Sequence, residues 1–135
     1  MKKYAACALV PSPPDDSNLF LAVSRKDDHE AFGLPGGKLE DDETFGMAME
    51  RELFEETGLV ALQYWNLFNA IDHEEWKTHT FLVDKFSGSL KTKEDIVIKW
   101  ATREEFYKGP FGKYCEEMFA CYDIFQKKHK AEIWW

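Results

Sequence analysis

A proline and two adjacent glycines in the segment Leu34–Leu39 precede the best-defined helix of this chain. Glycine and proline allow backbone geometry that other residues resist, so this segment either turns sharply or is approached closely by another group. Thr44 is a typical N-cap, and Gly58 fits the position where a left-handed residue ends a helix. The sequence therefore predicts a helix over Phe45–Thr57 that follows directly on a glycine-rich break in regular structure.

Short apolar segments before and after this helix indicate β-strands. The expected strands are Tyr4–Val10, Leu19–Ser24, Ala61–Ala70, His79–Phe86 and Ile96–Ala101. The first two are expected to pair with each other, and the polar run Asp72–Glu75 is expected to form a hairpin tip. A short helix after Thr102–Glu105 and an amphipathic helix around Cys115–Gln126 complete the pattern. Strands interleaved with helices predict an α+β protein in which helices cover a mixed sheet.

Length and charge limit the classes of partner. The chain has 135 residues, 44% of them apolar, which suffices for one core, so we expect a single domain over residues 1–135. The net charge of -8 argues against a nucleic-acid polymer as partner. No apolar run approaches the ~20 residues that span a bilayer, so no membrane partner is expected.

The cysteines indicate a compartment. Cys7, Cys115 and Cys121 are an odd number without metal-ligand spacing, which suits reduced thiols that pack in the interior. We therefore expect a cytoplasmic protein. The C-terminal Ile133–Trp135 is expected to be either a tucked tail or a contact surface. The oligomeric state stays open at this point, with a dimer as one alternative.

Three glutamates share one side of the first predicted helix. At about 100° per residue, Glu52, Glu55 and Glu56 fall within an arc of about 100°. Like charges crowded in this way repel one another and raise their pKa values, and a cation would relieve that repulsion. Mg²⁺ is commonly held by a few carboxylates together with water and substrate phosphates. A solvated acidic face is the alternative interpretation of these three residues alone.

The residues around this cluster complete a longer motif. From Gly37 the sequence reads GKLEDDETFGMAMERELFEETGL, which fits G-x₅-E-x₇-R-E-U-x-E-E-x-G-U, where U is apolar, at every specified position. Such a match arises by chance on the order of once in 10⁹ starting points. In this motif the chain resembles the Nudix hydrolase family, whose signature it is. The flanking segments Phe32–Glu40 and Lys99–Phe106 also resemble that family, so the resemblance covers roughly Leu19 to Phe106.

The resemblance implies an α/β/α sandwich with a mixed β-sheet and a loop-helix-loop metal site. It also implies Mg²⁺- or Mn²⁺-dependent hydrolysis of a nucleoside diphosphate linked to another group. The metal ligands carried over from the family motif are Gly37, through its carbonyl, and Glu52, Glu55 and Glu56, through their carboxylates. Attack by a metal-activated water, without a covalent intermediate, is the expected mechanism.

Further roles follow from the same resemblance. Glu43 and Arg51 are expected to pair and to hold the loop against the helix. Glu94 is the candidate for an additional carboxylate from the loop before the late strand, with a solvated turn residue as the alternative. The catalytic residues are then Glu52, Glu55, Glu56 and Glu94, with Glu52 preferred over Glu94 as general base.

Substrate-binding residues are less constrained by the motif. Arg25 and Lys38 stand where the fold analogy places positive charge near phosphates, although either is also compatible with an ordinary solvated cation. Phe32 is a candidate stacking surface for a base, with Trp76 and Phe111 as further aromatic candidates, and core packing is the alternative for all three.

The substrate class is argued from absent submotifs. No proline lies between Pro35 and Pro110, and no tyrosine stands in the segment Asp72–Trp76, so the patterns of the ADP-ribose and dinucleoside-polyphosphate branches are missing. We expect a MutT-type activity that cleaves a normal or oxidised (deoxy)nucleoside triphosphate to the monophosphate and pyrophosphate. Hydrolysis of ADP-ribose or a nucleotide sugar, and a Nudix module that binds nucleotide without turnover, are the alternatives.

Overall fold

The seven strands form two sheets. The structure is a computed structural model that describes residues 3–14 and 16–133; the predicted tail ending in Trp134 and Trp135 lies partly outside these residues. One sheet has the order β4 (Gly36–Lys38), β1 (Tyr4–Leu9), β6 (Lys77–Ser87), β5 (Val60–Ile71). The other has the order β3 (Phe32–Gly33), β2 (Phe20–Ser24), β7 (Ile98–Ala101). β1 and β6 run parallel and the other pairs antiparallel, so the predicted mixed pairing is confirmed.

The expected pairing of the first two strands is wrong. β1 and β2 belong to different sheets, because both edges of β1 are already taken, one by β4 and the other by β6. Only an isolated bridge between Pro11 and Phe20 joins the two segments where the chain turns from one sheet to the other.

The glycine-rich break is itself a short strand. Gly36 and Gly37 pair with Cys7 and Ala6 of β1, so the backbone here is extended and not a sharp turn. A Cβ on Gly36 would lie 2.3 Å from the carbonyl oxygen of Ala6, a distance that real Cβ atoms do not adopt. The expected close approach to this backbone is therefore present, and the approaching group is β1.

Helix α1 (Phe45–Thr57) has the predicted bounds. The Thr44 hydroxyl accepts a hydrogen bond from the Met47 N–H at 3.1 Å, which satisfies one free donor of the first turn. Gly58 adopts φ 81°, in the left-handed region, and donates its N–H to the Phe54 carbonyl. Both caps fix where α1 starts and stops, and therefore how its glutamates stand relative to the sheet.

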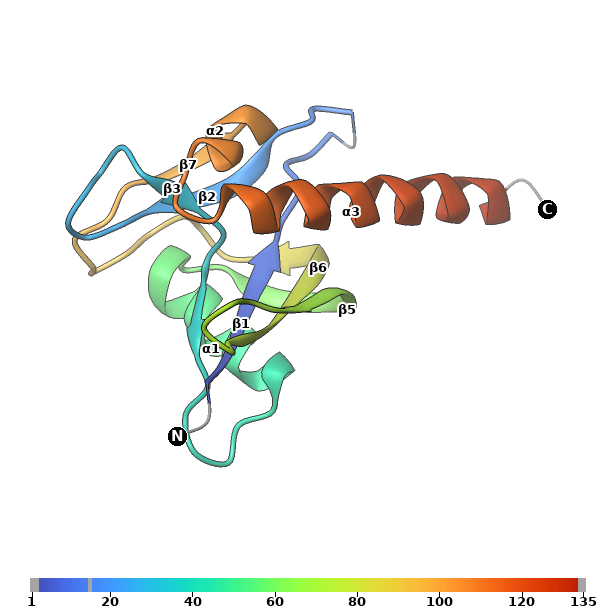
Figure 1. Cartoon of the computed structure of the whole chain (residues 1–135). Coiled ribbons are helices and arrows are strands. Elements are labelled where there is room, and N and C mark those ends of the chain that lie inside the picture. Colours follow the sequence, from blue (N-terminus) through green and yellow to red (C-terminus); the bar gives the residue numbers. More distant parts are fainter. Residues whose placement is uncertain (1–2, 15, 134–135) are drawn as a thin grey trace.

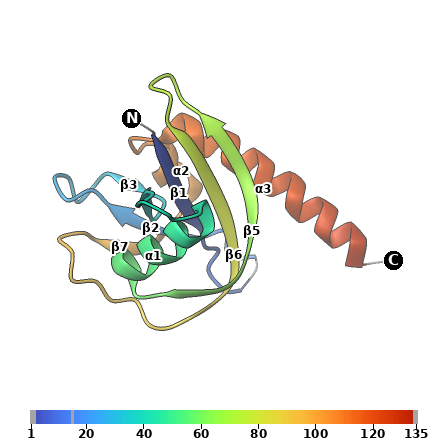
Figure 2. The same ribbon diagram turned by 90° about the horizontal axis from the view of Figure 1, so that it is seen from below.

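Helices cover both sides of the sheets, as the two views in Figures 1 and 2 show for α1 on one side and α2 (Arg103–Tyr107) with α3 (Gly112–Ile133) on the other. Two apolar clusters fill the two interfaces. The α1 side buries Ala48, Met49 and Leu53 of the helix against β1, β5 and β6. The α3 side buries Cys115, Met118, Phe119 and Tyr122, as the predicted amphipathic stripe requires. Burial of each large side chain contributes about 1.5–3 kcal/mol.

The remaining predicted elements are found close to their expected positions. The three later strands match β5, β6 and β7, and the polar run Asp72–Glu75 joins β5 to β6 as a hairpin tip. Thr102 caps α2 through a reciprocal pair of hydrogen bonds with Glu105. Within residues 3–14 and 16–133, no helix is both long and apolar enough to cross a membrane.

Candidate functional site

The glycine strand β4 and helix α1 meet at two glutamates. The Gly36 N–H donates a hydrogen bond of 2.8 Å to Glu56 Oε1. One residue further on, a Cβ added to Gly37 would lie 2.6 Å from Glu52 Cδ, so the Glu52 carboxylate rests directly on the Gly37 backbone. The motif therefore brings Gly37, Glu52 and Glu56 together, because glycine alone leaves room for the carboxylate.

Glu52 and Glu56 open into a cleft of about 580 Å³. Its lining comes from the end of β2 and the following loop, from α1, and from the loop before β7: Ser24, Arg25, Lys26, Asp27, Glu52, Glu56, Glu94 and Ile96. Glu94 thus faces the same cleft as the two helix glutamates, although 38 positions separate it from Glu56 in the sequence. The cleft combines four carboxylates, those of Asp27, Glu52, Glu56 and Glu94, with two cations.

Glu52 and Glu56 have pKa values above that of free glutamate. Burial raises the pKa of Glu56 from 4.5 to about 8; the Gly36 N–H lowers it, and the charges of Glu52 and Glu94 raise it further. Burial also raises the pKa of Glu52, against the opposing effect of Arg51. Arg51 pairs with Glu52 and the Gly36 N–H donates to Glu56, and a divalent cation would further favour the charged form of both carboxylates.

Arg51 lies at the centre of the acidic surface of α1. Its guanidinium donates to both Glu43 oxygens, at 2.8 and 3.0 Å, so the expected pairing of these two residues is present. It also donates to Glu52 at 2.8 Å, to Glu55 at 3.3 Å and to the Lys38 carbonyl at 3.1 Å. Arg51 lowers the pKa of Glu43, which in turn raises that of Arg51. This network ties the loop before α1 to the helix.

Three other predicted site residues, Glu55, Lys38 and Arg25, have their charged groups in contact with residues other than the cleft glutamates. Glu55 is half exposed and turns toward Arg51, so it does not line the cleft. Lys38 places its ammonium 5.4 Å from the centre of the Trp76 ring and is also absent from the lining. Arg25 does line the cleft, but its guanidinium pairs with Asp27 at 2.8 Å.

Phe32 is buried, with 7% of its surface exposed. The Lys99 ammonium lies 4.2 Å from the centre of its ring and also contacts the Glu105 carboxylate. A base could stack on this face of Phe32 only after Lys99 moves. Phe111, the other aromatic candidate of this region, is 63% exposed and lies beside Gly33.

Sequence reasoning missed part of the cleft lining. Ser24, Lys26 and Ile96 belong to the lining but to no motif. Asp27 also lines the cleft and belongs to no motif. For Ser24, the available signal was its position at the last residue of a predicted strand. Lys26 lies 3.9 Å from Glu94 and brings a second cation to the cleft.

The donor set of the cleft fits a divalent cation. It consists of carboxylate and backbone oxygens, which hard cations such as Mg²⁺ prefer. Burial first, and then the charges of Glu52 and Glu94, raise the pKa of Glu56. In the part of the chain that is described, no three His, Cys, Asp or Glu side chains converge closely enough to hold an ion as they stand. Arg51 holds one oxygen of Glu52 and one of Glu55, so cation binding requires these carboxylates to turn.

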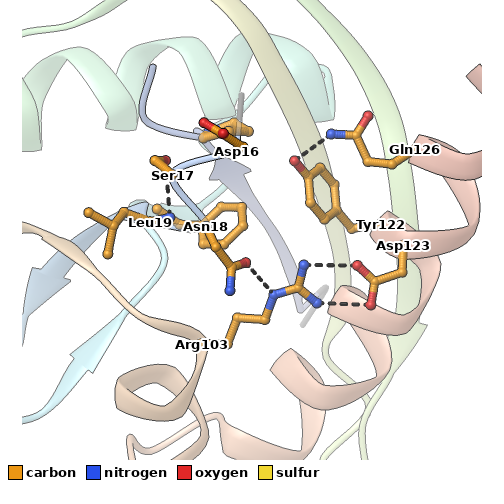
Figure 3. A pocket seen from close by; sticks show the side chains of 10 residues that line it. Asp16, Ser17, Asn18, Leu19, Arg103, Tyr122, Asp123 and Gln126 are labelled. Carbon is orange, nitrogen blue, oxygen red and sulfur yellow. Dashed lines mark hydrogen bonds and ion pairs between the residues drawn. The ribbon is translucent and has the colours of Figure 1, made fainter. Parts of the chain in front are cut away.

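A second, smaller cavity of about 220 Å³ lies between the segment before β2 and helices α2 and α3 (Figure 3). Arg103 is the cation of this cavity, and its guanidinium is engaged by neighbouring side chains. The guanidinium donates to both Asp123 oxygens at 2.8 and 2.9 Å and to Asn18 at 3.0 Å, and it stacks over Phe119. We interpret this cavity as a structural joint between α2, α3 and the first turn.

A family model of the NUDIX domain matches residues 1–120. The chain belongs to the NUDIX family. Among curated relatives of this NUDIX chain is the 8-oxo-dGTP diphosphatase of Escherichia coli (strain K12), 33% identical over 92 residues, covering 64% of the chain and 70% of the relative. The enzyme of the same name from Buchnera aphidicola subsp. Schizaphis graminum is 28% identical over 88 residues, covering 62% and 67%.

A third relative is the diphosphoinositol polyphosphate phosphohydrolase 3-beta of Bos taurus, 34% identical over 106 residues, covering 78% of this chain and 63% of the relative. Solved structures agree on the fold. MutT from Aliivibrio salmonicida and Vibrio cholerae superposes with a TM-score of 0.68 at 19% identity, covering 87% of this chain and 95% of that one. The E. coli ORF135 protein gives 0.70 at 23% identity, covering 89% and 91%. The expected α+β Nudix fold is thus confirmed.

Proposed function

We propose that this Nudix hydrolase cleaves a normal or oxidised (deoxy)nucleoside triphosphate to the nucleoside monophosphate and pyrophosphate, with Mg²⁺ or Mn²⁺ as cofactor. The observation that carries the proposal is the cleft in which Glu52, Glu56 and Glu94 face one another beside the glycine strand. The two relatives named 8-oxo-dGTP diphosphatase support the substrate class, because each aligns with more than three fifths of this chain.

In this proposal the acidic residues of the cleft hold the cation and the basic residues bind phosphate. In our proposal Glu52 and Glu56, with the Gly37 carbonyl, hold the cation, and Glu55 joins them when it turns from Arg51. A bound divalent ion supplies neutralisation of the phosphate oxygens and a lower pKa for water. Arg25 and Lys26 stand at the cleft as partners for phosphate charge. Lys38 can reach the cleft only by leaving Trp76.

The proposed reaction is a direct displacement at phosphorus. Water forms the new phosphorus–oxygen bond, the bridging phosphorus–oxygen bond breaks, and the leaving phosphate keeps that electron pair. Glu52 takes the proton of the water, with Glu94 as the alternative base, because both carboxylates face the cleft. No side chain of the cleft is required to form a covalent intermediate.

Two other functions stay as proposals. One is hydrolysis of another diphosphate, such as ADP-ribose, a nucleotide sugar, or the kind of substrate named for the bovine relative. The other is nucleotide binding without turnover. The complete set of motif glutamates disfavours simple binding, because a sensor has no chemical need for all of them.

A substrate panel tests the proposal. Nucleoside triphosphates, 8-oxo-dGTP, ADP-ribose, nucleotide sugars and a diphosphoinositol polyphosphate are each incubated with Mg²⁺, with Mn²⁺ and with EDTA, in water labelled in oxygen. We expect pyrophosphate release from triphosphates only with metal, and the label identifies the phosphorus attacked. Tight nucleotide binding without any metal-dependent turnover would support the binding module instead.

The cellular compartment and the partner of the enzyme are also proposals. We place it in the cytoplasm with a free nucleotide as its partner, because its three cysteines are unpaired and Cys115 is buried. Burial raises the pKa of Cys7 to about 11 and that of Cys115 to about 12, so neither thiol is a reactive nucleophile at neutral pH.

A further inference from the structure

β5 is the one long edge strand within the described residues. It pairs with β6 on one side and with no strand on the other. The other edge strands, β3, β4 and β7, have two, three and four residues, whereas β5 has 12. A strand of this length spans about 40 Å. Such an edge presents a row of backbone N–H and C=O groups that match another strand.

The sequence of this edge lacks the charges that usually protect one. Residues 57–71 contain no Asp, Glu, Lys or Arg, and they form the longest run of this kind in a chain in which 31% of residues are charged. Lysine and other charges on edge strands are a common means of preventing contact between copies of a protein. β5 lacks that protection along its whole length.

Apolar side chains stand exposed beside the edge. Leu62 is 62% exposed and Trp65 48% exposed, and both lie in the half of β5 that follows α1. Figure 2 shows α3 running past β5 and projecting beyond it, and the contact between Phe68 and Tyr114 places the cover of α3 near the hairpin half. The α1 half of β5 therefore keeps its apolar surface uncovered on that face.

Helix α1 lies beside β5 at Tyr64. Gly46 packs against the Tyr64 hydroxyl, with 3.1 Å from an ideal Cβ to that oxygen, so this flank of α1 lies along β5. Met47 is 51% exposed and Phe54 56% exposed, and they stand seven positions apart on one face of the helix. Leu62 and Trp65 are exposed apolar groups on β5 itself, and Glu50 of α1 lies beside Tyr64.

We propose that β5 pairs antiparallel with β5 of a second copy of this chain across a two-fold axis. An antiparallel edge is complementary to itself, because residue i of one copy meets j of the other while j meets i. Two molecules of net charge -8 repel each other, and the uncharged run keeps charges off the paired strands themselves. Two acidic groups lie beside this run: Asp84, which accepts a hydrogen bond from Trp65, and Glu50, beside Tyr64. A standard interface buries about 800 Å² per copy, which the backbone edge and its neighbouring side chains together must supply.

The bulges of β5 define where the pairing is regular. The register of β5 against β6 shifts between Ala61 and Tyr64 and between Asn66 and Phe68. Regular strand therefore runs over Tyr64–Asn66 and Phe68–Ile71. The pair of strands uses these stretches for its backbone hydrogen bonds, while Leu62 and Trp65 pack beside them.

Sedimentation velocity and light scattering on the full chain, from low micromolar to several hundred micromolar, test the proposal. We expect a dimer with twice the 15.8 kDa mass of the chain. Leu62→Lys places a charge on the edge without removing a buried group, and it should shift the protein to monomer with a dissociation constant at least about tenfold weaker. Ile124→Lys, at a 67% exposed apolar position on α3, is the matched control and should leave the dimer intact.

Hydrogen exchange locates the interface independently of mass. Amides of residues 64–71 should exchange more slowly at high than at low protein concentration, and Leu62→Lys should abolish that difference. A wild-type monomer at every concentration overturns the proposal. A dimer that survives Leu62→Lys with unchanged exchange in β5, or that Ile124→Lys breaks equally, also overturns it.

Discussion

The Glu52 carboxylate lies against the Cα of Gly37, leaving no room for a Cβ, whose nearest atom would be 2.6 Å away. Gly37→Ala should therefore push Glu52 out of the cleft. A displacement of about 1 Å at a reacting centre costs about 100-fold in rate, so we expect kcat/KM to fall at least that far. Steady-state hydrolysis of the best substrate from the panel measures this.

Gly33→Ala is the matched control for that substitution. A Cβ on Gly33 would meet nothing nearer than Phe111 at 3.7 Å, an ordinary contact. It should keep activity within about threefold of wild type. Equal losses in the two variants, with both folded by circular dichroism, would argue against a specific role of the Gly37 and Glu52 contact.

Glu56 makes stability depend on pH. Its pKa is raised from 4.5 to about 8, so the folded state binds a proton that the unfolded state has lost. The contribution of Glu56 to stability is therefore greatest below pH 4.5 and is lost as the pH rises to about 8. In metal-free buffer above that range, Glu56→Gln should be the more stable protein by at least about 1 kcal/mol, or roughly 4 °C.

Melting curves in EDTA, from acid to alkaline pH, check this expectation. The difference between Glu56→Gln and wild type should grow across the window and then level off. A constant difference would mean that Glu56 titrates near its ordinary pKa in the folded protein.

Added divalent ions should reverse the order of stability of wild type and Glu56→Gln. Filling the cleft with Mg²⁺ at about ten times its dissociation constant stabilises wild type by about 1.4 kcal/mol, or roughly 5 °C. Glu56→Gln should lose most of this increase, because it removes a ligand charge. Glu104→Gln, an exposed glutamate on α2, should keep it. Melting temperatures that are indifferent to millimolar Mg²⁺ in wild type would contradict occupancy without substrate.

The Glu43 and Arg51 pair should contribute to stability. Both side chains are largely buried, and two hydrogen bonds join them. A double-mutant cycle with Glu43→Gln and Arg51→Met should give a coupling energy of about 1–2 kcal/mol by urea unfolding. Because Arg51 lowers the pKa of Glu43, this contribution is present above the unfolded pKa of 4.5 and is lost as the pH falls through the lower folded value.

The exposed pair of Arg25 and Asp27 serves as the comparison. It has similar geometry, at 2.8 Å, but both side chains are more than half exposed. The corresponding cycle should give no measurable coupling. A coupling as large as that of Glu43 and Arg51 would show that geometry, and not burial, sets the value.

Local signals predicted the bounds of α1 and the positions of its glutamates on the helix. The Thr44 cap, the Gly58 terminator and the spacing of Glu52 and Glu56 all act within one helix, so the sequence was enough to place them. The motif also indicated the Glu43 and Arg51 pair, because its partners are eight residues apart and fixed by the same helix start.

Longer-range relationships were less accessible. The pairing of β1 depends on which strands occupy its two edges. Those strands are β4 and β6, which are far apart in sequence. The burial of Phe32 and the position of Lys99 over its ring depend on the packing of α2, which no local pattern encodes. Glu94 was identified by analogy, and its position at the cleft follows from the loop before β7.

Arg51 donates hydrogen bonds to three glutamates, Glu43, Glu52 and Glu55. Its guanidinium is therefore a counter-ion within the protein that holds the loop before α1 against the helix. If a metal binds Glu52 and Glu55 as proposed, it takes over carboxylates that Arg51 holds, so that binding would exchange one cation for another. Under that proposal, lack of metal would stop hydrolysis, while Arg51 would keep the loop and the helix folded together.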